Sequence, residues 1–316
     1  MAKLEREDIQ IISRHSTWSK KQVAQILKED IYNNKESWNK FLRLFFMSLG
    51  IGFTTAGIIF FFAYNWADLH KFIKLGLIEG LIIIVTAIIL FSKLNSDVKN
   101  ILLVGNAILV GVLFAVFGQI YQTGANAYDF FLGWALFISL WVAVSNFAPL
   151  WLLFIVLINT TFILYWQQVA MGWSEVFVFT ILFLINSGLL ITSFLLKKLI
   201  KDIEIPIWFS NILALAAVSY TTIGVIFGIF NPIEIPFYLL LLITVLLYGL
   251  GIKYALKYKN SFYIALISFS IIVIISAYLL NFSHDASMVF FISLFVIGSV
   301  TFIIKNLIDL QKKWIN

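Results

Sequence analysis

The sequence has no cysteine, only three histidines and few charged residues. Without cysteine, the 316-residue chain has no disulfide, no thiolate nucleophile and no cysteine-ligated metal. The histidines His15, His70 and His284 are scattered, and none stands in a HExxH motif. Charged residues make up 12% of the chain, about half of what a soluble globular domain carries. A soluble globule is therefore excluded, and an ordinary soluble-type active site is not expected.

What the chain has in abundance is apolar surface. Hydrophobic residues account for 61% of it, and its mean hydropathy is +0.98, so the chain is an integral membrane protein. Phosphate-loop, Rossmann and nucleophile-elbow patterns are missing. We therefore expect no enzymatic activity, no cofactor and no metal site. His70 with Asp68, and His284 with Asp285, could hold zinc, but loop histidines near a membrane surface are more often solvated.

Residues 1–43 form the only sizeable hydrophilic segment. Ser19 and Gln22 have the spacing of a capping box, which predicts an amphipathic helix after Ser19. This segment either packs beside the membrane surface or binds a cytosolic partner. Its basic and acidic residues are too evenly mixed to track phosphates, so no nucleic acid is expected as a partner. Residues 305–316 form a short basic tail.

Between these segments, residues 44–304 predict an all-α, polytopic membrane helix bundle. Apolar runs of about 20 residues, enough to cross the hydrocarbon core, recur between short polar breaks. Ten such spans are predicted: Leu44–Tyr64, Phe72–Phe91, Asn100–Gln122, Tyr128–Ser145, Pro149–Gln167, Trp173–Leu196, Ile207–Phe230, Ile235–Leu256, Ser261–Leu280 and Ser287–Ile304. The fourth and fifth depend on the short, uncharged connection at Ser145–Pro149.

The distribution of basic residues predicts the orientation. With ten spans both termini share one side, and that side receives all of the 22 lysines and arginines except Lys71 and Lys74. By the positive-inside rule, both termini are cytoplasmic.

Small residues recur at helix-packing spacing in several predicted spans. Gly224 and Gly228 form a GxxxG motif, which lets two helices approach closely. Packing within one bundle is the simplest interpretation, and homo-oligomerisation is the alternative.

A polar, glycine-punctuated stretch, Phe117–Asp129, interrupts the apolar sequence between the third and fourth spans. Gly124 has the position of a C-terminal helix cap, and Asn126 with Asp129 has the spacing of a capping pair. The stretch is therefore predicted to be a tight hairpin, with Gly124 at positive φ.

The same region supplies the candidate polar pocket of the outer leaflet. Its members are polar residues of the hairpin and of the second span with its preceding loop: Asp68, His70, Glu79, Gln119, Tyr121, Gln122 and Asp129. Two interpretations stay open. The amides bridge helices and satisfy the hairpin backbone, or they line an outward-opening pocket for a small molecule or ion.

Glu79 is the acidic residue set deepest within a predicted span. It lies about 10 Å beyond Phe72, too deep for so short a side chain to reach the interface. We therefore expect Glu79 to point into the bundle toward Gln119 and Gln122. There it either locks two helices together as the neutral acid or forms a proton or cation site.

Two sequence patterns carry a resemblance to a known family. Phe117–Trp134, with GQIYQTGA at Gly118–Ala125, and Tyr64–Asp68 followed by Lys74 resemble the bacterial predicted membrane proteins of domain of unknown function 2157. The likeness covers about residues 10–170. It implies a bacterial cytoplasmic (inner) membrane protein with several spans, and it brings no established activity, cofactor or catalytic residue.

Two classes of function fit these observations. The first is a small-molecule or ion permease, or a ligand-binding membrane protein, with a polar site in the outer leaflet. The alternative is a non-transporting scaffold or regulator that presents residues 1–43 to a cytosolic partner. In both cases the lipid bilayer is the surrounding partner.

Overall fold

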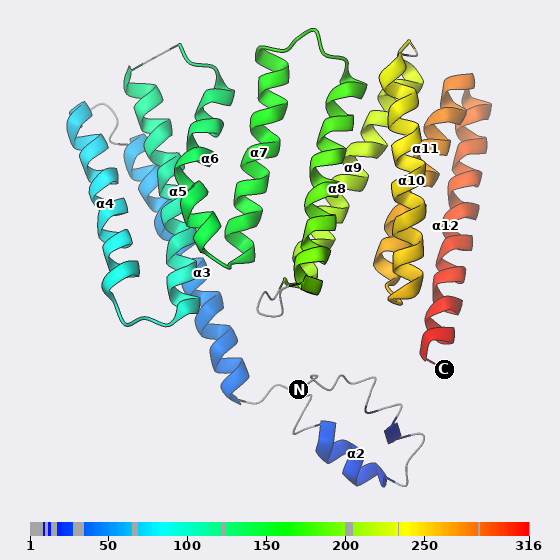
Figure 1. The fold of residues 1–316 in the computed structure, drawn as a ribbon, viewed down its shortest axis with the longest axis horizontal. Helices are drawn as coiled ribbons and strands as arrows, with labels where there is room; N and C mark the ends of the chain where they lie inside the picture. Colours follow the sequence, from blue (N-terminus) through cyan, green and yellow to red (C-terminus); the bar gives the residue numbers. More distant parts are fainter. Residues whose placement is uncertain are drawn as a thin grey trace. The chain divides into compact units, whose positions relative to one another are not determined.

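The computed structural model describes residues 9, 12–13, 18–27, 35–64, 69–121, 124–199, 205–232, 234–283 and 285–315. In these residues there are eleven α-helices and no strands (Figure 1). The helices are α2 (Lys20–Ile26), α3 (Lys35–Tyr64), α4 (Lys71–Phe91), α5 (Ser96–Tyr121), α6 (Ala127–Val144), α7 (Ala148–Gln168), α8 (Glu175–Leu199), α9 (Ile207–Phe230), α10 (Ile235–Lys257), α11 (Ser261–Phe282) and α12 (Ala286–Ile315).

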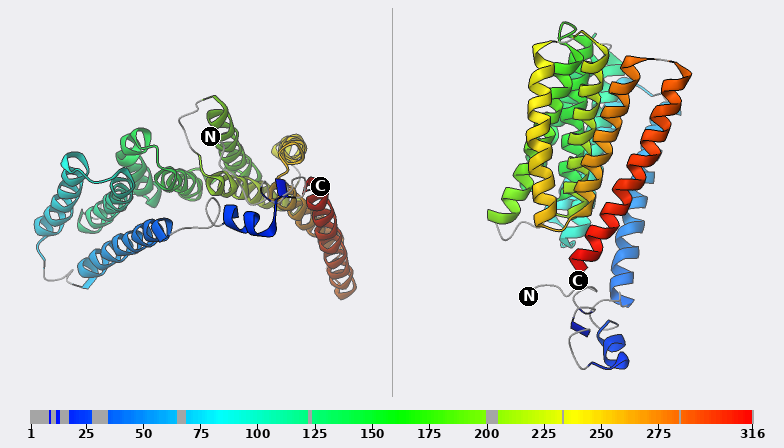
Figure 2. Two further views of the ribbon diagram at one scale, coloured as in Figure 1. Left: turned by 90° about the horizontal axis from the view of Figure 1, so that it is seen from below. Right: turned by 90° about the vertical axis from the view of Figure 1, so that its right-hand side faces the viewer.

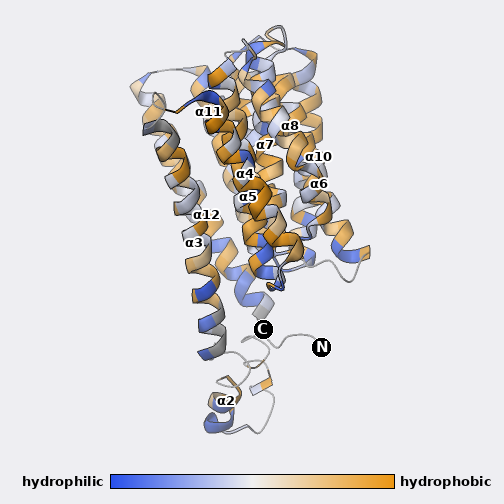
Figure 3. Cartoon of the chain, turned by 90° about the vertical axis from the view of Figure 1, so that its left-hand side faces the viewer, coloured by the Kyte–Doolittle hydropathy of each residue, from blue (hydrophilic) through white to orange (hydrophobic). Residues whose placement is uncertain are grey.

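Within the described residues, the helices from α3 to α12 are all long and apolar enough to cross a membrane, ten in total. This confirms the ten predicted spans one for one. Hydrophobic residues follow the long helices along their lengths, and hydrophilic residues are most frequent near helix ends and on α2 (Figure 3). The fold class is therefore a polytopic, all-helical membrane bundle.

Two of these helices extend well beyond the spans predicted for them. α3 and α12 each contain 30 residues, or about 45 Å of helix against about 30 Å of hydrocarbon. Positions 43/44 and 304/305, predicted to separate the bundle from its flanking segments, lie inside these continuous helices. The change in hydropathy there is a change of environment along one helix and not a break in it.

The short connection between the fourth and fifth predicted spans has a helix on each side. α6 has 18 residues and α7 has 21. The Ser145 backbone N–H donates to the Trp141 carbonyl at 2.9 Å, closing the last turn of α6. Pro149 is the second residue of α7, a position where its missing N–H removes no intrahelical hydrogen bond.

The chain divides into two compact units, Met1–Leu150 and Trp151–Trp314. The sequence predicted no boundary inside the bundle. In the first unit, α5 packs against α3, α4 and α6. Ile78 of α4 joins Val112 and Val116 of α5 in a buried apolar cluster. At Gly111, an added Cβ would lie 2.6 Å from the Trp134 ring, so this glycine lets α6 approach α5.

In the second unit, α9 packs against α8, α10 and α11. The GxxxG motif lies at these contacts. A Cβ on Gly224 would lie 2.9 Å from the Phe179 Cβ of α8, and one on Gly228 would collide with the Phe237 ring of α10. The motif therefore serves packing inside this unit, as the simpler of the two interpretations predicted.

Candidate functional site

The hairpin between α5 and α6 has the local geometry that its sequence predicted. Gly124 has φ of 66°, which confirms the expected left-handed conformation. The Asn126 N–H donates to the Asp129 carboxylate at 3.1 Å, so Asp129 satisfies a backbone donor at the start of α6. Gln122 lies outside the described residues. The described part of the hairpin is thus organised by its own backbone and by one carboxylate.

Other members of the predicted pocket lie at the ends of α4 and α5. Gln119, Tyr121 and His70 are all exposed. The Lys71 Nζ is 5.9 Å from the centroid of the Tyr121 ring and 5.3 Å from that of Phe72, within the range of a cation–π contact. Tyr121 is therefore near Lys71, which the sequence placed on the outer side but not in the candidate pocket. Asp68 and His284 lie outside the described residues, so neither of the two pairs considered for zinc, which were not expected to bind it, is tested.

Glu79 does not point into the bundle as predicted. Its side chain is exposed, whereas Lys74 and Ile78 are 6% and 0% exposed. Ile78 lies on the face of α4 that packs against α5, and the buried Lys74 lies one helical turn before it. Each residue step rotates the helix by about 100°, so Glu79 turns away from the face that Ile78 occupies. The prediction failed because depth along a helix does not fix direction around it.

A polar pair that the sequence had not identified, with a buried asparagine and a partly buried threonine, lies between α4 and α5. Asn106 is 1% exposed, and its Nδ2 donates to the Thr86 hydroxyl at 2.8 Å. Its Oδ1 accepts no hydrogen bond from the described residues. An asparagine within an apolar run was the available signal, but its partner on α4 could not be deduced from sequence.

The second unit holds a larger buried hydroxyl network near the middle of α9, α10 and α11. Tyr248 lies 2.6 Å from Ser270, and Ser270 lies 2.6 Å from Thr222. Because Thr222 donates to the Val218 carbonyl, its single proton is used. Ser270 must therefore donate to Thr222, and Tyr248 to Ser270.

The neighbouring pair follows the same rule. Thr244 donates to the Leu240 carbonyl, so Thr221 must donate to Thr244, 2.7 Å away. In both sets of hydrogen-bonded hydroxyls, each hydroxyl proton is donated either to another hydroxyl or to a backbone carbonyl. The network therefore holds three helices together and has no spare donor for a ligand.

An amide pair links α7 to α8. The Asn186 Nδ2 donates to the Asn159 Oδ1 at 2.8 Å, and the Asn159 Nδ2 donates to the Asn186 Oδ1 at 3.3 Å. Each Nδ2 also donates to a carbonyl of its own helix, at Leu182 and Ile155 respectively. Both NH₂ groups are thus fully used, which makes this pair a second structural link.

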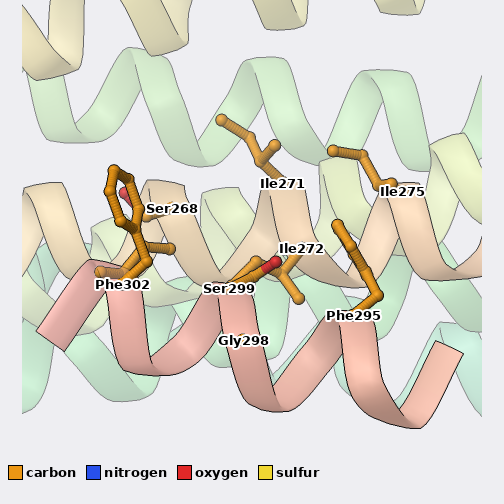
Figure 4. A pocket seen from close by; sticks show the side chains of 9 residues that line it. Ser268, Ile271, Ile272, Ile275, Phe295, Gly298, Ser299 and Phe302 are labelled. Atoms are coloured by element: carbon orange, nitrogen blue, oxygen red, sulfur yellow. The ribbon is translucent and has the colours of Figure 1, made fainter. Parts of the chain in front are cut away.

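A groove of about 520 Å³ lies between α11 and α12. Its walls are apolar apart from two serines, and its lining residues are Ser268, Ile271, Ile272, Ile275, Phe295, Gly298, Ser299, Phe302 and Ile303. Phe295, Ser299 and Phe302 rise from α12 toward α11, and Ser268 lies beside the Phe302 ring (Figure 4). The Phe302 side chain is 66% exposed, so the groove opens on the lateral surface of the unit.

The groove lies between two helices that are held together at both ends. The short connection from Phe282 to Ala286 joins them at one end. At the other, Gln311 donates to the Ser261 hydroxyl at 3.0 Å, and the Lys259 Nζ donates to the Trp314 carbonyl at 3.0 Å. In the right-hand view of Figure 2, α12 comes close to its neighbours near its C-terminal end and diverges from α11 toward the connection. The gap between the two helices therefore widens from the C-terminal end of α12 toward the connection.

The groove contains two hydroxyls that make no hydrogen bond to any described residue, those of Ser268 and Ser299. Both side chains are partly exposed. Unlike the network of α9–α11, these groups keep their donor and acceptor capacity available. Apolar walls with a small number of available polar groups are typical of a binding site for an apolar or amphiphilic molecule.

The match to known proteins covers the first unit. Residues 15–151 match the model of the DUF2157 family of predicted membrane proteins. This confirms the resemblance seen in the hairpin sequence. No curated protein and no solved structure matches the chain.

The end of the DUF2157 match coincides with the boundary between the two units. The match stops at residue 151, and the second unit begins at Trp151. The candidate pocket of the sequence therefore lies in the DUF2157 region, whereas the α11–α12 groove lies outside it. The groove residues were missed because their sequence consists of ordinary apolar span residues, with serines that small-residue packing would equally explain.

Proposed function

We propose that this protein binds a membrane lipid, with an acyl chain held in the groove between α11 and α12. The observation that carries the proposal is the groove itself, with apolar walls and the two available hydroxyls of Ser268 and Ser299. Its volume is within the range of small-molecule sites, and its open side faces where lipid chains lie around a membrane helix. This is the ligand-binding form of the first hypothesis, with the site moved from the outer-leaflet pocket to the second unit.

Gly298 offers a direct test. A Cβ added there would meet no atom of the described residues within 4 Å, so Gly298→Leu should fill the groove without disturbing the fold. Gly249→Leu is the matched control, because Gly249 is an exposed helical glycine of α10 with equally open surroundings. Native mass spectrometry of the purified protein in mild detergent would count the retained phospholipid. We expect Gly298→Leu to lose it and Gly249→Leu to keep it. Equal retention by both variants would refute the proposal.

We also propose that the protein lies in the bacterial cytoplasmic membrane with both termini in the cytoplasm. The support is the position of the basic residues, of which Lys71 and Lys74 alone fall on the opposite side. The helix order supports this proposal, because ten crossings return the chain to its starting side.

The scaffold hypothesis remains the second candidate, and one observation favours it. α2 begins with the predicted capping box, in which the Gln22 N–H donates to the Ser19 hydroxyl and the Ser19 N–H to the Gln22 amide oxygen. The helix has no fully buried residue, so the apolar side chains of Val23 and Ile26 remain partly accessible. The Gly298→Leu variant separates the two hypotheses, because filling a groove in α11–α12 leaves a role of α2 intact.

A further inference from the structure

A basic stripe lies on α12 beyond the end of the groove, toward the C-terminus of the helix. Gly298, Lys305 and Lys312 lie seven residues apart, a spacing that places them along one side of a helix. Gly298 lines the groove, and both lysines are exposed. Lys305 is the twentieth residue of α12 counted from Ala286, which is about the length that crosses the hydrocarbon core. The first lysine of the stripe is therefore at the depth of the lipid headgroups.

The turn between α10 and α11 adds positive charge at the same end. The Lys259 Nζ donates to the Trp314 carbonyl, which brings this turn to the end of α12. Lys257 precedes the turn, with its Nζ 5.6 Å from the Tyr258 ring centroid. Asp309 is the only acidic residue in the sequences of the turn and of α12 from Gly298 onward. The charge at the groove end is thus clearly positive.

The available hydroxyls lie at a depth that complements these lysines. Ser299 is six residues from Lys305, or about 9 Å along the helix toward the membrane centre. Ser268 lies on α11 beside the Phe302 ring, closer to the lysine end of the groove than Ser299 (Figure 4). A glycerophospholipid has the same order of groups along its length: a charged phosphate, then ester carbonyls that accept hydrogen bonds, then apolar chains. A phospholipid with its headgroup near Lys305 would have its ester carbonyls near the two serines and one acyl chain near Phe295.

We infer that the groove selects an anionic phospholipid from the leaflet at the lysine end of α12. The Lys305 and Lys312 ammonium groups bind the negatively charged headgroup, Ser268 and Ser299 donate to the ester carbonyls, and the apolar walls hold one acyl chain. This inference rests on the proposed lipid-binding function and adds the charge class and leaflet of the lipid. In the proposed orientation, that leaflet is the cytoplasmic one.

The test compares two lipids that differ only in headgroup charge. The full-length protein would be equilibrated with equal amounts of phosphatidylglycerol and phosphatidylcholine of identical acyl chains, and the bound lipids counted by native mass spectrometry. Lys305→Gln/Lys312→Gln removes the two charges while keeping polar side chains of similar length. Lys197→Gln/Lys198→Gln is the matched control, because these exposed lysines end α8, another membrane-spanning helix.

The wild-type protein should retain more phosphatidylglycerol than phosphatidylcholine. The Lys305→Gln/Lys312→Gln variant should lose that preference by about fivefold for each lysine removed, while its retention of phosphatidylcholine stays unchanged. The α8 control should behave as the wild type. Equal retention of both lipids by the wild type, or a preference that survives the double substitution, would overturn this inference and leave lipid binding standing. Undiminished retention of both lipids by Gly298→Leu would instead overturn the proposed function itself.

Discussion

At the residue scale, Gly124 adopts a backbone conformation that other residues adopt only with strain. Its φ of 66° lies in the left-handed region, where a Cβ meets the following carbonyl oxygen. Gly124→Ala should therefore destabilise the protein by about 1 kcal/mol, measured as a lower thermal unfolding temperature in detergent.

Gly118→Ala is the control for that substitution. Gly118 lies in α5, and a Cβ there would meet nothing within 4 Å among the described residues. Alanine is a better helix former than glycine, so this variant should be as stable as the wild type or slightly more stable. If both variants shift the unfolding temperature in the same direction, the hairpin conformation is not what determines the effect.

Single residues also show what sequence can and cannot predict. Gly124 and the Asn126–Asp129 cap were predicted because their signals are local: a residue type and a spacing of three. The direction of Glu79 was not, because it depends on which face of α4 packs against α5. That face is selected by Ile78 and its contacts with Val112 and Val116, and these contacts join residues more than thirty positions apart in the sequence.

At the scale of the helix, the Asn159–Asn186 pair provides a measurable link between α7 and α8. Replacing either asparagine by leucine leaves one donor and one acceptor of the other asparagine unpaired, whereas replacing both leaves neither. Each single variant should lose about 1 kcal/mol of stability, and the double variant should lose clearly less than the sum. A double-mutant cycle of unfolding free energies in detergent measures the difference. Strictly additive losses would mean that the two amides do not stabilise each other.

Helices themselves were the most predictable part of the fold. Length and hydropathy were enough to find all ten membrane-length helices in the described residues, because crossing a bilayer requires about 20 apolar residues. The partners within the hydroxyl network could not be foreseen. Threonine and serine are common in apolar helices, and only the packing of α9 against α10 and α11 shows which of them meet.

At the scale of the whole molecule, the division between Leu150 and Trp151 separates a unit with a recognisable sequence motif from a unit without one. The first unit carries nearly all of the DUF2157 match, and its hairpin motif allowed that resemblance to be recognised from sequence. The second unit carries the groove, the hydroxyl network and the amide pair. Its apolar spans contain no distinctive motif, so only the structure shows the groove between α11 and α12.

The orientation of the whole chain gives a further prediction. Reporter fusions after Asn146 and after Tyr258 should both behave as cytoplasmic, because each follows an even number of crossings, whereas a fusion after Gly172 should behave as extracytoplasmic. Activity of a periplasmic reporter fused after Tyr258 would reject the topology. The same result after Asn146 alone would reject a full crossing by α6 or α7.

The most direct test of lipid binding is photo-crosslinking in the membrane with a phospholipid that carries a diazirine in one acyl chain, followed by mapping of the labelled peptides. Bulk lipid labels every exposed helix face alike, whereas a lipid held in the groove concentrates the label on residues 268–275 and 295–303. We expect that concentration in the wild type, its loss in Gly298→Leu, and its persistence in Gly249→Leu. Label spread evenly over the exposed faces of the helices, or unchanged by Gly298→Leu, would contradict it.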